Sequence, residues 1–495
     1  METTQITRYR RSVLKLIAEY TWNDSLPENI PDILYQVVKD EDTRVRCCVH
    51  KERAVLKNRI QMALWQPIGT NLSKAAQVAL TGKIDKTLPV MDVLPDACDA
   101  CPIDKYYVTD VCRHCIQHKC MDNCPKHAIS IQNGKAFIDR NKCIECGRCA
   151  KSCPYGAVIE INRPCIKACA LNATSSGPDK ITVIDYDKCV SCGQCRSACP
   201  FGALDERSMI VPLLVALKRG EKVVAMVAPS FIGQFGPKIT PAQVIAGLKK
   251  LGFADVVEVA VGADITTLAE AEEFKAKVPK EQEFMTSSCC PAFVEHVKKH
   301  FPEYEKNISR TTSPMVSCGI WVKQKYKDVQ TCFIGPCIAK KVETIRHSDV
   351  IDFALTYEEL SCVFEGVGID LAAEDAAEYV STATGGGNGF PLTAGVQKSM
   401  LAVLEKQGAP QVTAEYADGL KNCQAKLQEI KQGKLKADYF EGMACPNGCV
   451  DGPGTLAQQG LTRVLLTKFA KAAPHQVSDE NGEAAEACAK YKFEV

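Results

Sequence analysis

Sixteen cysteines between residues 98 and 199 constrain the fold of this 495-residue chain more than any other feature. They lie in short segments broken by glycine, proline and asparagine, which leaves too little apolar sequence for an ordinary core. The whole chain has 28 cysteines, and soft thiolates in that number are typical of metal binding where thiols stay reduced. We therefore expect metal clusters to provide much of the stability of this region.

The cysteine spacing is that of bacterial ferredoxins. Residues 143–154 and 189–200 both have the pattern Cys-x2-Cys-x2-Cys-x3-Cys-Pro, in which three cysteines bind one four-iron cluster and the fourth binds the partner cluster. Residues 112–125 form a third run with variant spacing. Cys98, Cys101, Cys165 and Cys169 look like a further repeat whose first pair has moved upstream. Four half-repeats, with four cysteines per cluster, predict about four accessory four-iron clusters.

The exchange of the fourth cysteine between partner repeats predicts four ligand sets. They are Cys112, Cys115, Cys120 with Cys153; Cys143, Cys146, Cys149 with Cys124; Cys189, Cys192, Cys195 with Cys169; and Cys98, Cys101, Cys165 with Cys199. A rival pairs Cys143, Cys146 and Cys149 with Cys199. Zinc is the other alternative, but a tetrahedral zinc site needs two separated pairs rather than three cysteines at intervals of three.

The remaining sequence predicts an α/β fold. Residues 1–95 have apolar residues at helical spacing, and residues 96–205 are the α+β ferredoxin-like part. From 206 to 470 strands alternate with helices, which is typical of parallel sheets, here two lobes around a buried metal centre. The expected elements are strands at 222–228 and 255–261 and helices at 241–251 and 266–278. Residues 372–391 are expected to be an acidic, glycine-rich surface loop, and 471–495 a polar, loosely ordered tail.

Three separated cysteine motifs follow the ferredoxin-like part. They are TSSCCP at 286–291, GPCIAKKVE at 335–343 and EGMACPNGC at 441–449. Ligands that converge from separate strand ends indicate a site between lobes. These motifs resemble the three signature segments of the iron-only (FeFe) hydrogenases, and the resemblance runs from about residue 98 to 465.

The resemblance implies an oxidoreductase that reversibly reduces protons to H2 at an H-cluster, a four-iron cluster joined to a di-iron unit with CO, CN and azadithiolate ligands. Matched by motif position, the cluster ligands are Cys290, Cys337, Cys445 and Cys449, with Cys449 as the bridge. The family also places Pro229, Ser230 and Met443 beside the di-iron unit, although apolar packing explains Met443 equally well.

The resemblance further implies a proton path. The thiol of Cys289 exchanges protons with the bridgehead amine, and Glu270, Ser309 and Glu273 are further steps, while Lys340 donates to a cyanide. Without the family, Cys289 would be a small buried apolar residue. Both glutamates would then lie on a solvated helix face, with Glu273 paired to Lys277, and Lys340 would be exposed.

The chain departs from the best-known family members at three places. Gly335 replaces a methionine, Met315 replaces a glutamine, and Gly452-Pro453-Gly454 replaces three glycines. We expect altered cyanide and carbonyl contacts without loss of a ligand. Seven cysteines fit no ligand spacing and are expected to be structural, with the first two undecided: Cys47, Cys48, Cys318, Cys332, Cys362, Cys423 and Cys488.

Charge and motifs narrow the partners. Lys plus Arg is 60 against 59 Asp plus Glu, so nothing favours nucleic acid. No long apolar run or leader pattern is visible, so we expect a cytoplasmic, anaerobic protein without membrane contact. Gly385–Gly389 is not a dinucleotide fingerprint; ferredoxin or flavodoxin is therefore the expected electron partner, and hydrogenase maturation proteins would be needed. The alternatives are a hydrogen sensor, an iron-sulfur assembly relative without the di-iron unit, and a pure polyferredoxin carrier.

Overall fold

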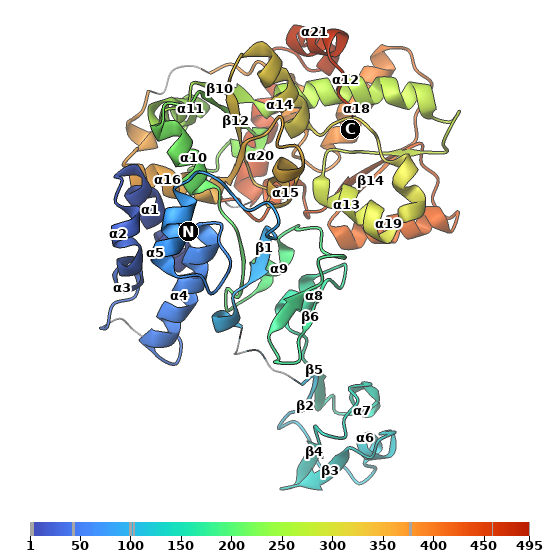
Figure 1. The fold of residues 1–495 in the computed structure, drawn as a ribbon. Helices are drawn as coiled ribbons and strands as arrows, with labels where there is room; N and C mark the ends of the chain where they lie inside the picture. Colours follow the sequence, from blue (N-terminus) through green and yellow to red (C-terminus); the bar gives the residue numbers. More distant parts are fainter. Residues whose placement is uncertain are drawn as a thin grey trace.

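The centre of the molecule is a pair of parallel sheets. The computed structural model describes residues 4–41, 45–98, 101, 104–375, 379–457 and 459–494. One sheet has the order β10-β9-β12-β13, and the other has the order β11-β15-β14. Their bounds are β9 Val223–Val227, β10 Asp255–Glu258, β11 Met285–Thr286, β12 Gln330–Gly335, β13 Phe353–Thr356, β14 Ala414–Asp418 and β15 Tyr439–Met443. All pairs in both sheets are parallel, which confirms the predicted parallel-sheet fold (Figure 1).

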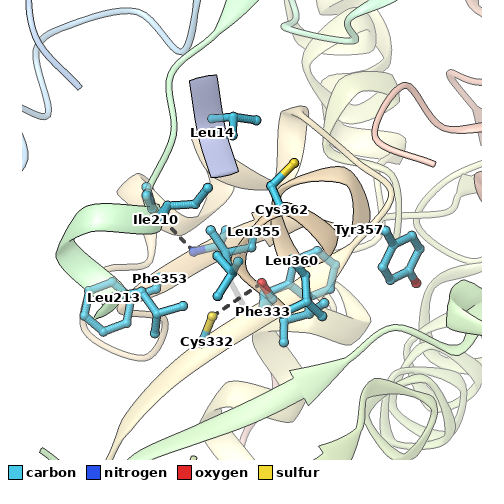
Figure 2. Packing of buried hydrophobic residues seen from close by; sticks show 14 of the residues in the cluster. Leu14, Ile210, Leu213, Cys332, Phe333, Phe353, Leu355, Tyr357, Leu360 and Cys362 are labelled. Atoms are coloured by element: carbon cyan, nitrogen blue, oxygen red, sulfur yellow. Dashed lines mark hydrogen bonds between the residues drawn. The ribbon is translucent and has the colours of Figure 1, made fainter. Parts of the chain in front are cut away.

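The larger sheet forms because its central strands are continuous apolar runs. Every residue of β9 is buried, and β12 pairs with β9 on one side and β13 on the other, as expected of parallel strands covered on both faces. The packed helices include α10 Ile210–Lys218, α11 Pro241–Leu251, α14 Pro314–Lys325 and α16 Tyr357–Val367. Figure 2 shows Cys332 and Cys362 in this core beside Phe333, Leu355 and Leu360, as expected of structural thiols.

The N-terminal helices pack directly on the larger sheet's domain. The predicted helical character is confirmed by α1 Gln5–Trp22, α4 Val49–Ala63 and α5 Leu72–Ala79. Helix α1 lies so close to α16 that a Cβ on Gly366 would be 2.6 Å from the carbonyl oxygen of Lys15. The buried carboxylate of Glu358 accepts hydrogen bonds from Arg10, Arg11 and Arg196. The first helices therefore join α16 to the inner ferredoxin-like domain through one buried ionic cluster.

Four half-repeats build two ferredoxin-like domains. In the outer domain, residues 104–161, β2 Tyr106–Val108 pairs with β5 Val158–Glu160, and β3 Ile129–Gln132 pairs with β4 Lys135–Ile138. In the inner domain, β1 Met91–Val93 pairs with β8 Leu204–Glu206, and β6 Thr174–Ser176 with β7 Thr182–Ile184. Figure 1 shows the outer domain projecting from the rest of the molecule. The third cysteine of each repeat lies on a short helix: α6 Lys119–Asp122, α7 Arg148–Ser152, α8 Pro164–Ala168 and α9 Gln194–Ala198.

Two predicted elements differ from the structure. The strand expected at 255–261 ends at Glu258, and the helix expected at 266–278 begins seven residues earlier, as α12 Val259–Lys277. Tertiary packing overrides the β-branched residues here, because α12 lies against α14 so closely that a Cβ on Gly262 would clash with the carbonyl oxygen of Pro314. The helix predicted at 241–251 is confirmed as α11, and the strand predicted at 222–228 is confirmed as β9.

The prediction of a surface loop at 372–391 is wrong for the second half of this segment. Ser381, Ala383, Thr384 and most of the next residues are buried, and α17 Gly385–Gly389 contacts α12 and α20 Gln459–Lys471. A Cβ on Gly387 would lie 2.5 Å from the carbonyl oxygen of Ala260. The glycines therefore allow close helix packing rather than surface flexibility; residues 376–378 lie outside the described residues.

The prediction of a polar, loosely ordered tail at 471–495 is also wrong. Beyond α20 the chain forms α21 Gly482–Lys490, which packs against α12. The side chains of Ser478 and Asn481 donate hydrogen bonds to the buried carboxylate of Asp264 at 2.8 Å, and Phe493 is buried. The polar composition of this segment predicted an exposed tail, but some of its polar side chains are buried because they donate hydrogen bonds to the buried carboxylate of Asp264. Within the described residues, no helix combines the length and the apolar character needed to cross a membrane.

Candidate active site

The candidate site is a cavity of about 90 Å³ at the carboxyl ends of strands from both sheets. Ser230 follows β9, Cys289 and Cys290 follow β11, Cys337 follows β12, and Met443 ends β15. The carboxyl edge of a parallel sheet is where ligands of such folds usually bind. The lining combines these residues with apolar side chains: Ala228, Pro229, Val259, Ala263, Pro291, Pro314, Met315, Phe333, Pro336, Phe390, Pro391, together with Lys340 and Cys449.

The structure brings the four predicted cluster cysteines together. Burial raises the pKa of Cys445 well above its usual value, and the neighbouring thiols of Cys337, Cys449 and Cys290 raise it further. Burial and then Cys290 raise the pKa of Cys337 to about 12. Gathering three of these thiols at the cavity with Cys445 next to them leaves them desolvated, which is unfavourable for the thiolates unless a metal binds them. The donor set therefore fits a thiolate-bound iron-sulfur cluster.

The residues of the predicted proton path form a chain of neighbouring side chains. Glu270 is fully buried on α12 and accepts a hydrogen bond from the hydroxyl of Tyr439 at 3.2 Å. Burial, and next the neighbouring Glu273, raise the pKa of Glu270 to about 8. Ser309 donates a hydrogen bond to Glu273 at 2.7 Å. Burial and the neighbours Cys290, Glu441 and Glu270 raise the pKa of Cys289 well above its usual value.

Glu273 lies at the outer end of this chain. The ammonium of Lys277 donates to it at 2.5 Å, and the backbone N–H of Arg310 donates at 2.9 Å. Burial acts to raise the pKa of Glu273, but these hydrogen bonds outweigh burial and lower it. The Lys277 pair expected of an isolated helix is therefore present together with the Ser309 contact.

Lys340 is buried, not on a solvated helix face. It lies on α15 Ala339–Arg346 with 8% of its surface exposed, and its ammonium donates to Glu343 at 2.6 Å, to Ser313 at 2.9 Å and to the carbonyl oxygen of Cys289 at 3.3 Å. Burial acts to lower the pKa of Lys340, but Glu343 outweighs burial and raises it. The ammonium stays charged beside the cavity, where it can hold an anionic ligand.

Two carboxylates of the site were missed from the sequence. Glu343 orients Lys340, and Glu441 lies in the fully buried strand β15 near Cys289. Glu441 accepts the backbone N–H of Gln397 at 2.7 Å, at the start of α18 Gly395–Lys406, and burial raises its pKa to about 8. An acid inside an otherwise apolar strand was the available signal for Glu441.

The other lining residues have structural partners as well. The hydroxyls of Ser230 and Tyr357 lie 2.8 Å apart, and Met443 packs with Ala263, Phe390 and Val396. Met315 lines the cavity where the best-known family members have glutamine. A Cβ on Gly452 would lie 2.6 Å from the carbonyl oxygen of Pro336, so this glycine is needed for packing.

The four half-repeats share two local features. In each, the sulfur of the fourth cysteine accepts the backbone N–H of the alanine four residues later, at 3.2–3.3 Å. The residue three positions after that cysteine has positive φ in all four repeats: His127, Gly156, Asn172 and Gly202. The fourth cysteines are Cys124, Cys153, Cys169 and Cys199. The same backbone turn therefore presents each of these sulfurs.

The displaced pair Cys98 and Cys101 lies where the repeat with Cys165 and Cys169 requires it. The backbone N–H of Thr182 donates to the sulfur of Cys98 at 3.2 Å, as that of Ala136 does to Cys112 at 3.5 Å. The pKa of Cys101 is raised by burial and then by Cys199, Cys165 and Cys98.

Two of the three remaining sets also agree with the predicted grouping. Burial and then Cys153 raise the pKa of Cys120, and burial, Cys189 and Cys169 are among the causes that raise the pKa of Cys192 to about 12. These contacts support the predicted pairing over the rival one, because Cys199 lies with Cys101 and Cys165.

The inner ferredoxin-like domain adjoins the candidate site. Cys337 is a neighbour that raises the pKa of Cys192, and Cys192 does the same for Cys445. An apolar cluster joins the two regions: Leu171, Val190, Ala292, Ala339, Leu420 and Ala444. The Cys189 set is thus the accessory set next to the cavity.

Comparison with known proteins agrees with this arrangement. The family model for the iron-only hydrogenase large subunit, C-terminal domain, matches residues 221–453, and two 4Fe-4S binding domain models match residues 135–158 and 182–205. The periplasmic [Fe] hydrogenase large subunit of Nitratidesulfovibrio vulgaris is 31% identical over 383 residues, which cover 66% of this chain and 88% of that protein. The chain belongs to the iron-only hydrogenase family.

Other relatives of the chain are of two kinds, hydrogenases and iron-sulfur assembly proteins. Iron hydrogenase 1 of Clostridium pasteurianum is 29% identical, with 64% of each chain covered. Cytosolic iron-sulfur assembly component 3 of Pongo abelii is 26% identical, with 53% of this chain and 67% of that protein covered. A solved structure of the [FeFe]-hydrogenase from Chlamydomonas reinhardtii has a TM-score of 0.47 and 22% identity, covering 55% of this chain and 90% of that one.

Proposed function

We propose that this protein is an FeFe hydrogenase that reversibly reduces protons to H2. Cys290, Cys337, Cys445 and Cys449 would hold an H-cluster, which when bound supplies the metal centre where the H–H bond forms or breaks. The observation that carries the proposal is the position of Cys289, which lines the cavity and lies near the buried carboxyl Glu270. An iron-sulfur carrier has no use for a free thiol and a relay carboxyl at that place.

The residues around the cavity would move protons and orient anionic ligands. Cys289 would pass a proton between the cavity and Glu270, whose pKa of about 8 suits exchange near neutral pH. Ser309 would relay it to Glu273, which lies nearer the surface. Lys340 would donate a charge-assisted hydrogen bond to a cyanide-like ligand, and Pro229, Ser230 and Met443 would line the di-iron position.

The accessory clusters would supply electrons. The four cysteine sets would lead from the outer domain through the Cys98 set and the Cys189 set to the cavity. The last step is supported by Cys192, which lies near Cys337 and Cys445. Ferredoxin or flavodoxin would deliver the electrons, and hydrogenase maturation proteins would install the di-iron unit.

Anaerobic expression with the maturation proteins tests this function. We expect infrared bands of bound carbonyl and cyanide, and H2 evolution from reduced methyl viologen. Cys289→Ala is expected to keep the infrared bands but lower evolution by about 100-fold or more, since a positioned proton donor contributes at least that much. Iron-sulfur signals without the carbonyl and cyanide bands, and without evolution, would instead indicate an assembly protein.

A further inference from the structure

The outer ferredoxin-like domain has a face of unpaired positive charge. Lys119 begins α6, and Arg148 and Lys151 lie three residues apart on α7, hence on one side of that helix. The two helices are neighbours, since Ser152 donates to the carbonyl oxygen of Lys119 at 3.3 Å. All three basic side chains are exposed, and none makes an ion pair with any described residue. Asp122 is the exposed acid of α6.

Four of the other basic residues in this domain are paired with acids, whereas Arg113 and Lys126 are exposed and make no ion pair with any described residue. Lys135 pairs with Asp110 at 2.7 Å, Arg140 with Asp104 at 3.4 Å, and Lys142 with Asp139 at 3.6 Å. Lys105 likewise pairs with Glu160. The α6–α7 face therefore keeps three positive charges that no described acid neutralises, and it also carries the cluster cysteines Cys120 and Cys149.

Comparison of the two domains indicates what this face does. Val190, between the first two cysteines of its run, is 6% exposed because it packs against the residues around the candidate site. Ile144 has the same place in the outer repeat and is 55% exposed. Arg148 and Lys151 stand where the inner repeat has Gln194 and Ser197. The position that packs as an interface in the inner domain is thus uncovered in the outer domain, and the helix that follows it there carries two basic residues.

A second exposed apolar residue lies beside another cluster cysteine. Ile116 follows Cys115 and is 97% exposed, in the run with two extra residues between its second and third cysteines. The rings of His114 and His118 stack beside it with centroids 5.4 Å apart. Apolar contacts with a charged rim are typical of protein interfaces.

We infer that the α6–α7 face, defined by Lys119, Arg148 and Lys151 with Ile116 and Ile144, docks a small acidic electron-carrier protein. The inference rests on the proposed function and specifies where its electrons enter. Two reduced one-electron carriers would each give one electron to the clusters under this face, and two protons and two electrons give one H2. Charge complementarity of this kind steers encounter and is weakened by salt.

The test uses a triple charge-reversal variant, Lys119→Glu, Arg148→Glu and Lys151→Glu, in the matured full-length protein. The probes are an acidic two-cluster ferredoxin and, in a second arm, an acidic flavodoxin. The matched control reverses three paired lysines: Lys105→Glu, Lys135→Glu and Lys142→Glu. Evolution from methyl viologen and the iron content of each preparation serve as references.

The KM for ferredoxin, at about 20 mM salt, is expected to rise by about 10-fold or more in the first variant and to change little in the control. The difference should shrink at about 300 mM salt, where charge interactions are screened. A rise with flavodoxin but not ferredoxin would support the face and identify the carrier. An unchanged KM for both carriers, or equal rises in both variants, would overturn the inference. Absence of viologen-driven evolution in the wild type would instead refute the proposed function.

Discussion

At the scale of single residues, Glu270 has the properties expected of a proton relay. It is fully buried and lies near both Cys289 and Glu273, whose charges interact with its own. Glu270→Gln keeps the size and hydrogen bonds but cannot exchange a proton. We expect H2 evolution to fall by about 100-fold or more, with unchanged carbonyl and cyanide infrared bands. Gln397→Glu is not a suitable control, because Gln397 contacts Glu441. The control is Glu272→Gln, an exposed change on the same helix, which should keep full activity.

Glu270 also links stability to pH. Its pKa of about 8 in the folded protein exceeds the usual 4.5, so the folded state holds this proton more tightly than the unfolded state. The stabilisation is complete below about pH 4.5 and is lost as pH rises through about 8. Chemical denaturation between pH 5.5 and 8.5 should show a smaller loss of stability with rising pH in Glu270→Gln than in the wild type. Parallel curves for the two proteins would contradict this.

Lys340 and Glu343 show why some residues of the site could not be predicted from the sequence. The motif GPCIAKK predicted Lys340, and its burial agrees, but the salt bridge to Glu343 depends on a tertiary environment that no spacing reveals. Glu343→Gln removes the neighbouring charge that keeps the ammonium fully charged. Because a buried lysine without its partner is costly, we expect the unfolding midpoint to fall and the cyanide infrared bands to shift. Lys325→Gln, on the exposed surface, is the control and should change neither.

At the scale of elements, local patterns predicted what local interactions determine. Cysteine spacing gave the four half-repeats, and the apolar run at 222–228 gave β9, because each carries its own signal. The segment around α17 and the tail with α21 could not be predicted, since their glycines and polar residues are buried by packing against α12.

The close packing of α17 is directly testable. Gly387→Ala would place a Cβ 2.5 Å from the carbonyl oxygen of Ala260 and 2.7 Å from a carboxylate oxygen of Asp264. We expect a loss of about 1–3 kcal/mol in the free energy of unfolding, as for other overpacked sites. The control is Gly482→Ala, because a Cβ at Gly482 meets no atom within 4 Å. Gly433→Ala is less suitable, since the positive φ of Gly433 would strain an alanine. Equal stability of the two variants would show that α17 is not tightly packed.

At the scale of the whole molecule, the moved cysteine pair ties the upstream segment to the inner domain. Cys98 is buried in the same core as Cys165 and Cys199, and Thr182 donates to its sulfur. Cys98→Ser should therefore remove one accessory cluster, lowering the iron content by about four atoms per chain. Cys47→Ser, an exposed thiol outside every ligand spacing, should keep the iron content. If the Cys98 set carries electrons between the outer domain and the Cys189 set, ferredoxin-driven evolution should fall much further than viologen-driven evolution. An unchanged iron count in Cys98→Ser would remove this residue from the ligand set and with it the continuous path from the outer domain to the cavity.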